Sequence, residues 1–211
     1  MSELAIALAA FVGTHFLLSH PLRGPLARRM GEGAFRGLYS LVSFATLGWA
    51  IWAYRDLGRQ APYWIAPQAV WIIGAILMWV ASVLLIGSFF GNPALPGAPR
   101  QERPQGVLAI TRHPMMWSFA IWALVHAAVI ATPKALILDG AIAFLALAGA
   151  LGQDRKKRGM HGDKWLAWVD QTHFIPFGRG FANPGSKALI GGTLLFLIAT
   201  WLHPIGVGLW R

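Results

Sequence analysis

Residues 69–90 read AVWIIGAILMWVASVLLIGSFF and contain no charged side chain. A helix that crosses the hydrocarbon core of a bilayer needs about 20 mainly apolar residues, and this run is long enough. Five similar segments lie before and after it, although the fifth of the six is weakened by Asp139. The six candidate spans are residues 3–20, 35–54, 69–90, 114–132, 135–151 and 188–202. The sequence therefore predicts an all-α polytopic membrane bundle of about six transmembrane helices.

The composition agrees with a membrane protein. Hydrophobic residues make up 56% of the 211 residues and charged residues 12%, and the mean hydropathy of +0.53 lies outside the range of soluble globular proteins. The longest polar stretch, residues 152–187, is too short to bury a core of its own, so residues 1–211 are predicted to form a single integral membrane domain. The chain has no cysteine, which leaves histidine, carboxylate or a cofactor to hold any metal.

The charge follows the predicted topology. The formal net charge is +10, and 14 of the 18 Lys and Arg residues lie in the first, third and fifth loops or, for Arg36, at the adjoining span end. Positive loops face the cytoplasm, so both termini are predicted to lie outside it. This bias explains the charge without nucleic acid, and the predicted partner of the chain is the lipid bilayer.

Two histidines lie inside apolar spans, His15 in the first and His126 in the fourth. An ionisable side chain at membrane depth is costly and is read as functional by default. A neutral histidine that donates to a backbone carbonyl is the plain alternative. A pair of imidazoles on separate helices is also how a bundle holds haem iron. Counted from the cytoplasmic ends, the two differ in depth by about 10 Å, which favours haem over a bare ion.

A further basic motif, Thr111-Arg112-His113-Pro114, marks the start of the fourth span. Proline is favoured in the first turn of a helix, so Arg112 and His113 lie where the cytoplasmic loop meets the membrane. They are predicted to act either as an interfacial cap and anchor or as a clamp for an anionic group such as a haem propionate, a lipid phosphate or a nucleotide-like cofactor. Asp154 is either a surface ion pair or a positioner for Arg112, and the sequence leaves both open.

The fifth loop contains a short amphipathic pattern. Trp165 and Trp168 are three residues apart, beside Lys164. This spacing places the tryptophans on one face and predicts a helix that lies in the membrane interface.

Several segments, taken in order, resemble the NnrU family of bacterial membrane proteins, which includes 15-cis-zeta-carotene isomerases. They are Gly13-Thr14-His15 with Arg23 after it, FRGLYSL at 35–41, SFFGNP at 88–93, ITRHPM at 110–115, LVH at 124–126, and residues 154–176. The resemblance implies a multi-pass protein of the bacterial inner membrane that binds haem b. In the isomerase branch the iron ligands are a histidine of the first helix and one 13 residues after the Arg-His-Pro histidine, which here are His15 and His126.

Two activities are implied by this resemblance. One is the redox-dependent cis-trans isomerisation of a lipophilic polyene, with a redox partner that the sequence does not identify. The other is a haem-based sensor or accessory role in nitrite and nitric oxide metabolism.

A second resemblance, to isoprenylcysteine carboxyl methyltransferases, rests on residues 106–114 and on Phe174-Ile175-Pro176-Phe177. It implies binding of S-adenosylmethionine by Arg112 and His113. Those enzymes usually carry a Glu-Glu pair where this chain has Gln153-Asp154, which weakens the similarity.

Overall fold

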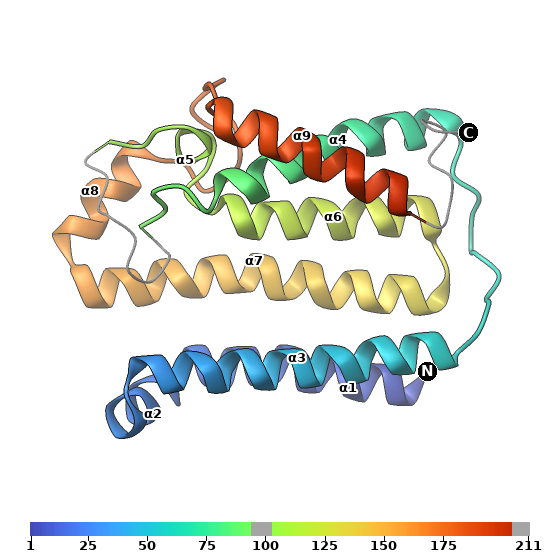
Figure 1. Ribbon diagram of the computed structural model, residues 1–211, viewed down its shortest axis with the longest axis horizontal. Coiled ribbons are helices and arrows are strands. Elements are labelled where there is room, and N and C mark those ends of the chain that lie inside the picture. The colour runs from blue at the N-terminus through green and yellow to red at the C-terminus, as the bar shows by residue number, and fades with distance from the viewer. Residues whose placement is uncertain (94–102, 204–211) are drawn as a thin grey trace.

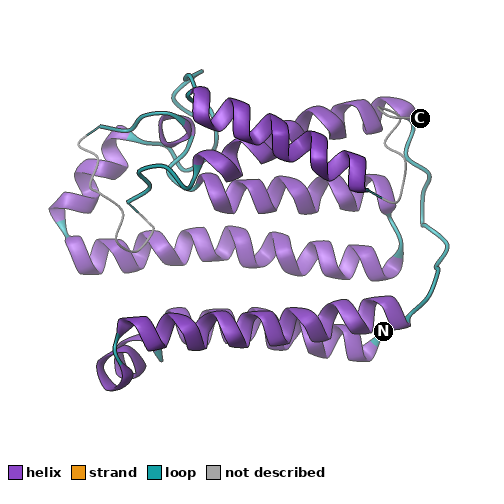
Figure 2. Cartoon of the chain, viewed as in Figure 1, coloured by secondary structure: helices purple, strands orange, loops and turns teal. Residues whose placement is uncertain are grey.

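The computed structural model describes residues 1–93 and 103–203 (Figures 1 and 2). Every regular element in these residues is a helix, and they contain no strand. The helices are α1 (Ser2–Ser19), α2 (Arg23–Met30), α3 (Glu32–Asp56), α4 (Gln68–Gly87), α5 (Val107–Ile110), α6 (Pro114–Ile130), α7 (Pro133–His161), α8 (Asp163–Gln171) and α9 (Ser186–Leu202). The all-α class is therefore confirmed.

The long helices run side by side (Figure 1). α7 packs against α6 and α1, α6 packs also against α4, and α4 packs against α9. α3 packs against α1, so α1 and α3 form a hairpin that meets the remaining helices through α7. The short helices α2, α5 and α8 gather at the end of the bundle opposite the N-terminus.

Each of the six predicted spans coincides with one long helix. Three of these helices, α1, α4 and α7, are long and apolar enough to cross a membrane. α6 and α9 are apolar but have 17 residues each, and serine, threonine, tyrosine and tryptophan dilute the apolar residues of α3. The structure thus supports a helical membrane protein, whereas six crossings and the sides of the termini stay predictions.

α7 is longer than the span predicted for it. Its apolar part ends near Leu151, and residues 153–161 continue the same helix with several charged side chains. We therefore treat Asp154, Lys156 and Lys157 as lying beyond the membrane-spanning part of α7. This extension brings charged groups to the end of the bundle where α1 stops and α6 begins (Figure 1).

Small side chains allow the helices to approach closely. Leu4 and Leu8 of α1 pack with Ala50 and Ala53 of α3, and Leu138 of α7 covers this cluster. Such contacts are typical of helix packing in membranes, where small residues let two backbones come together. The α1–α3 hairpin is therefore fixed to α7 near the N-terminus of α1.

α4 and α9 approach even more closely. A methyl group added at Gly192 would lie 2.5 Å from the Cα atom of Val83, so only glycine fits at this crossing.

The amphipathic helix predicted in the fifth loop is α8, and its place in the membrane interface stays a prediction. Trp165 and Trp168 are 4% and 7% exposed and pack on Leu108 of α5. The pattern predicted the helix but not its partner, because an apolar helical face packs equally well on lipid or on protein. Here α5 covers that face.

Candidate functional site

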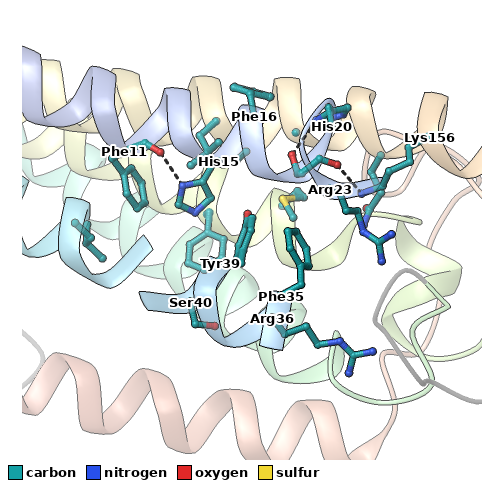
Figure 3. A pocket seen from close by; sticks show the side chains of 18 of the residues that line it. Phe11, His15, Phe16, His20, Arg23, Phe35, Arg36, Tyr39, Ser40 and Lys156 are labelled. Carbon is teal, nitrogen blue, oxygen red and sulfur yellow. Dashed lines mark hydrogen bonds between the residues drawn. The ribbon is translucent and has the colours of Figure 1, made fainter. Parts of the chain in front are cut away.

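Two cavities each contain one of the candidate histidines, and the larger of these two lies among α1, α3, α6 and α7 at the end where α2 begins (Figure 3). Its volume is about 700 Å³, within the size range of ligand sites in proteins. Most of its wall is apolar or aromatic. The lining residues include Phe11, His15, Phe16, His20, Arg23, Glu32, Phe35, Arg36, Tyr39, Phe119, Leu145, Gln153 and Lys156.

His15 is held by its own helix. Nδ1 lies 2.7 Å from the carbonyl oxygen of Phe11, which can only accept, so Nδ1 carries the proton and donates it. The lone pair is then on Nε2, which lies 3.4 Å from Oγ of Ser43. Phe11 and Tyr39 pack edge-on against the ring. A second hydrogen bond of this kind fixes the tautomer and orientation of metal-ligating histidines in general.

Cationic side chains line the same cavity at the end away from His15, as Figure 3 shows for Arg23, Arg36 and Lys156. Arg23 forms an ion pair of 3.2 Å with Glu32. Burial, followed by the positive charges of Arg23 and Lys157, holds the pKa of Lys156 below its ordinary value. The cavity is therefore apolar with an imidazole at one end and basic at the other.

The second cavity, of about 510 Å³, lies among α4, α6 and α9 and contains His126. Nδ1 of His126 lies 2.8 Å from the carbonyl oxygen of Trp122, so this ring also keeps its lone pair on Nε2. The imidazole stacks on the indole of Trp122, with ring centroids 4.1 Å apart, and the ring of His203 is 6.1 Å away. Aliphatic and aromatic side chains such as Trp71 and Phe196 form most of the wall.

The two histidines predicted to share one iron line different cavities. His15 lies on the α1 side of α7, and His126 lies between α6 and its neighbours α4 and α9. Phe119 of α6 lines both cavities and forms part of the wall between them. The depth count from sequence did not reveal which helices are neighbours, and ligation of one haem by both histidines stays a prediction.

Arg112 and His113 meet Asp154 of α7. Nε and Nη2 of Arg112 lie 2.9 and 2.7 Å from Oδ2 of Asp154, and Nε2 of His113 lies 2.9 Å from Oδ1. The side chains of Arg112, His113 and Asp154 are 12%, 0% and 18% exposed, respectively. Burial alone would raise the pKa of Asp154, but the hydrogen bonds and charges of His113 and Arg112 outweigh it and keep that pKa below its usual value.

This cluster answers the question that the sequence left open for Asp154, which pairs with both residues of the motif. Neither Arg112 nor His113 lines either cavity. The cluster joins the start of α6 to the polar extension of α7, and its two donors already share a carboxylate.

The loop after α8 secures the cluster from the other side. Oγ1 of Thr111 and Nε1 of Trp117 both donate to the carbonyl oxygen of Phe174, at 2.7 and 2.8 Å. The Phe174 ring also packs edge-on against His113, and the guanidinium of Arg112 lies over it. The buried ion pairs therefore sit in a packed corner of the fold.

Comparison with known families fits this arrangement. The family profile described as NnrU protein matches residues 3–210. The chain belongs to the NnrU family. No curated protein and no solved structure matches the chain. The family match includes both cavities and the Arg112 cluster, so all of these features belong to the NnrU region.

Reasoning from sequence missed part of the site of this NnrU protein. Arg23, Arg36 and Lys156 were given no role in binding, although their positions near span ends were a usable signal. Gln153, whose Oε1 lies 3.2 Å from Nδ1 of His113, also lines the larger cavity and so connects it to the cluster. His203 carried no signal beyond its place near a span end.

No group of three or more His, Asp or Glu side chains is gathered at one point among residues 1–93 and 103–203 of the NnrU protein. A bare transition metal needs several such ligands, whereas haem brings four of its own and takes one or two from the protein. The chemistry of His15 and its cavity fits haem in this respect.

Proposed function

We propose that this NnrU protein is an integral membrane protein that binds haem b in the larger cavity, with Nε2 of His15 as an axial ligand. The observation that carries the proposal is one imidazole, fixed by Phe11, in an apolar cavity of about 700 Å³ whose far end is basic. A cavity with these features suits a planar, largely apolar cofactor that carries charged groups along one edge.

An absorption spectrum tests the proposal. The protein purified in detergent after expression with ample haem should show a Soret band that sharpens on reduction. His15→Ala should lose most of the haem, and His161→Ala, on the polar end of α7, is the matched control. Normal haem content in His15→Ala would refute ligation by His15.

The predicted second ligand, His126, needs its own test because it lines the other cavity. If His126 completes the coordination, the two cavities must merge past Phe119. His126→Ala should then convert a six-coordinate, low-spin spectrum into a five-coordinate one. An unchanged spin state in this variant would restrict ligation to His15.

For activity we propose redox-dependent cis-trans isomerisation of a lipophilic polyene. Haem iron would supply a redox-active electrophile. The second cavity supports a lipophilic substrate, because its wall is mainly aliphatic and aromatic and, among the described lining residues, Phe119 is the one common to both cavities. The chain would bind the polyene there and exclude water.

Incubation of the reduced holoprotein with a cis-carotene, followed by chromatography of the isomers, tests this activity. Phe119→Ala should change the product ratio while haem content stays constant. Equal isomer ratios with and without protein would refute the proposed isomerase activity.

A specific observation favours a second candidate, a haem-based sensor in nitrite and nitric oxide metabolism. Among the described lining residues of the larger cavity, the imidazole other than His15 is His20, which lies towards the basic end (Figure 3). Iron held by His15 alone would leave one coordination position for a diatomic gas. Rapid binding of carbon monoxide by the reduced protein, without isomerase activity, would favour the sensor.

We further propose six crossings of the bacterial inner membrane with both termini outside the cytoplasm. The basic helix α2 and the Lys- and Arg-rich end of α7 lie at the end of the bundle opposite the N-terminus, which supports this topology (Figure 1). The methyltransferase alternative gains no support, because Arg112 and His113 are already engaged by Asp154.

A further inference from the structure

We infer that Arg36 and Lys156, assisted by Arg23, bind the two propionate carboxylates of the haem, a role that was one of several left open by the sequence for Arg112 and His113. This inference rests on the proposed function, because it concerns the same cavity. It assigns the basic end of that cavity to the charged edge of the ligand.

The charge of the cavity wall supports this assignment. Three cations, Arg23, Arg36 and Lys156, line the cavity, and Glu32 is the acidic residue among its described lining. Glu32 pairs with Arg23. Arg36 and Lys156 form no ion pair within the described part of the chain. Among the described residues the cavity therefore contains two cations without an anionic partner, which matches the two carboxylates of a haem.

The positions of these cations relative to the His15 imidazole also support the assignment. The ammonium of Lys156 lies 3.4 Å from the carbonyl oxygen of Ser19. Ser19 is one helical turn beyond His15 on α1, about 6 Å along the axis. Arg36 lies one turn before Ser40 on α3, which also lines the cavity, and Figure 3 shows it towards the basic end. The cations therefore lie about one helical turn beyond the imidazole, at the basic end of the same cavity.

Without a bound anion, the positive charges around Lys156 repel one another. Lys156 is half-buried and close to the like charges of Arg23 and Lys157, which is unfavourable for its charged form. A carboxylate between these groups would offset the repulsion and accept charge-assisted hydrogen bonds. By contrast, Arg112 and His113 are already hydrogen-bonded to Asp154, and neither residue lines the cavity.

A phospholipid phosphate would present the same anionic oxygens at this depth. The test therefore uses metal-free protoporphyrin IX and its uncharged dimethyl ester as probes of the full-length protein in detergent. Porphyrin fluorescence reports binding without any iron ligation. Wild type should bind the free acid at least tenfold more tightly than the ester.

Arg36→Gln and Lys156→Gln should each weaken binding of the free acid about tenfold and leave binding of the ester unchanged. Arg29→Gln is the matched control, because Arg29 is an exposed cation of α2 that lines neither cavity. Equal affinities of acid and ester in wild type, or no porphyrin binding at all, would overturn the inference.

Two further arms separate the alternatives. If the variants lose binding of anionic phosphatidylglycerol in nanodiscs but keep the preference for the free acid, the basic end is a lipid site and the inference is wrong. His15→Ala should keep the preference for the free acid even though it loses haem. A failure of iron ligation by His15 is thus distinguishable from a failure of the propionate assignment.

Discussion

Asp154→Ala should destabilise the protein more than any other single charge deletion among the described residues, because it leaves two donors without their acceptor. Arg112 makes two close contacts with Asp154 and His113 makes one, and His113 is fully buried. Removal of one member of a buried ion pair costs about 3–5 kcal/mol, most of it from the charge left behind. Asp154→Asn keeps the size and one acceptor oxygen, so it should lose about half as much.

Unfolding of the purified protein by SDS, followed by circular dichroism, measures this loss. A double-mutant cycle with Arg112→Ala separates the pairwise interaction from the rest, and we expect a coupling of about 1.5–3 kcal/mol. Protoporphyrin binding should change little, because the cluster lines neither cavity. A loss below about 0.5 kcal/mol in Asp154→Ala, the size of an ordinary surface substitution, would refute the description of this cluster as a buried anchor.

Three further outcomes are expected. The cluster should remain intact above pH 3.8, the ordinary pKa of the Asp154 carboxyl, and its contribution should disappear as the pH falls through the lower pKa of the folded state, which acid titration of stability in wild type and Asp154→Asn would show. Gly192→Ala should lower the unfolding midpoint by forcing α9 away from Val83, whereas Gly140→Ala, with no atom near the new methyl group, should be neutral or slightly stabilising in the same assay. A reporter fused to the C-terminus should be active only outside the cytoplasm and one inserted near Gly159 only inside, and the reverse pattern would invert the topology.

The helices could be predicted from sequence because each is a nearly continuous apolar run, and such a run has few ways to satisfy its backbone except as a helix. The hydrogen bonds that fix His15 and His126 were also within reach, since an inward-facing imidazole can bond the carbonyl four residues earlier. Burial alone identified both histidines, and that part of the reasoning needed no neighbours.

Contacts between distant segments were not predictable in the same way. Asp154 lies about 40 residues after Arg112 in the chain, and nothing in its local sequence distinguishes it from a surface acid. Likewise, helical spacing gives the height of a residue along a helix but not the identity of the helix beside it. The separation of His15 from His126 follows from α1 packing on α3 and α7, and that choice depends on side-chain packing throughout the bundle.

The attachment of the α1–α3 hairpin has a consequence for how the protein is assembled. Near the N-terminus the hairpin is fixed to α7 by Leu4, Leu8 and Leu138, while towards its other end the hairpin, α6 and α7 enclose the larger cavity. The ribosome delivers α1 and α3 to the membrane well before α7, so the cavity has no complete wall until most of the chain has been inserted. A cofactor would therefore enter late and would add contacts between the first hairpin and the later helices. Cells short of that cofactor should accumulate a protein whose N-terminal hairpin is the first part to be lost to proteases.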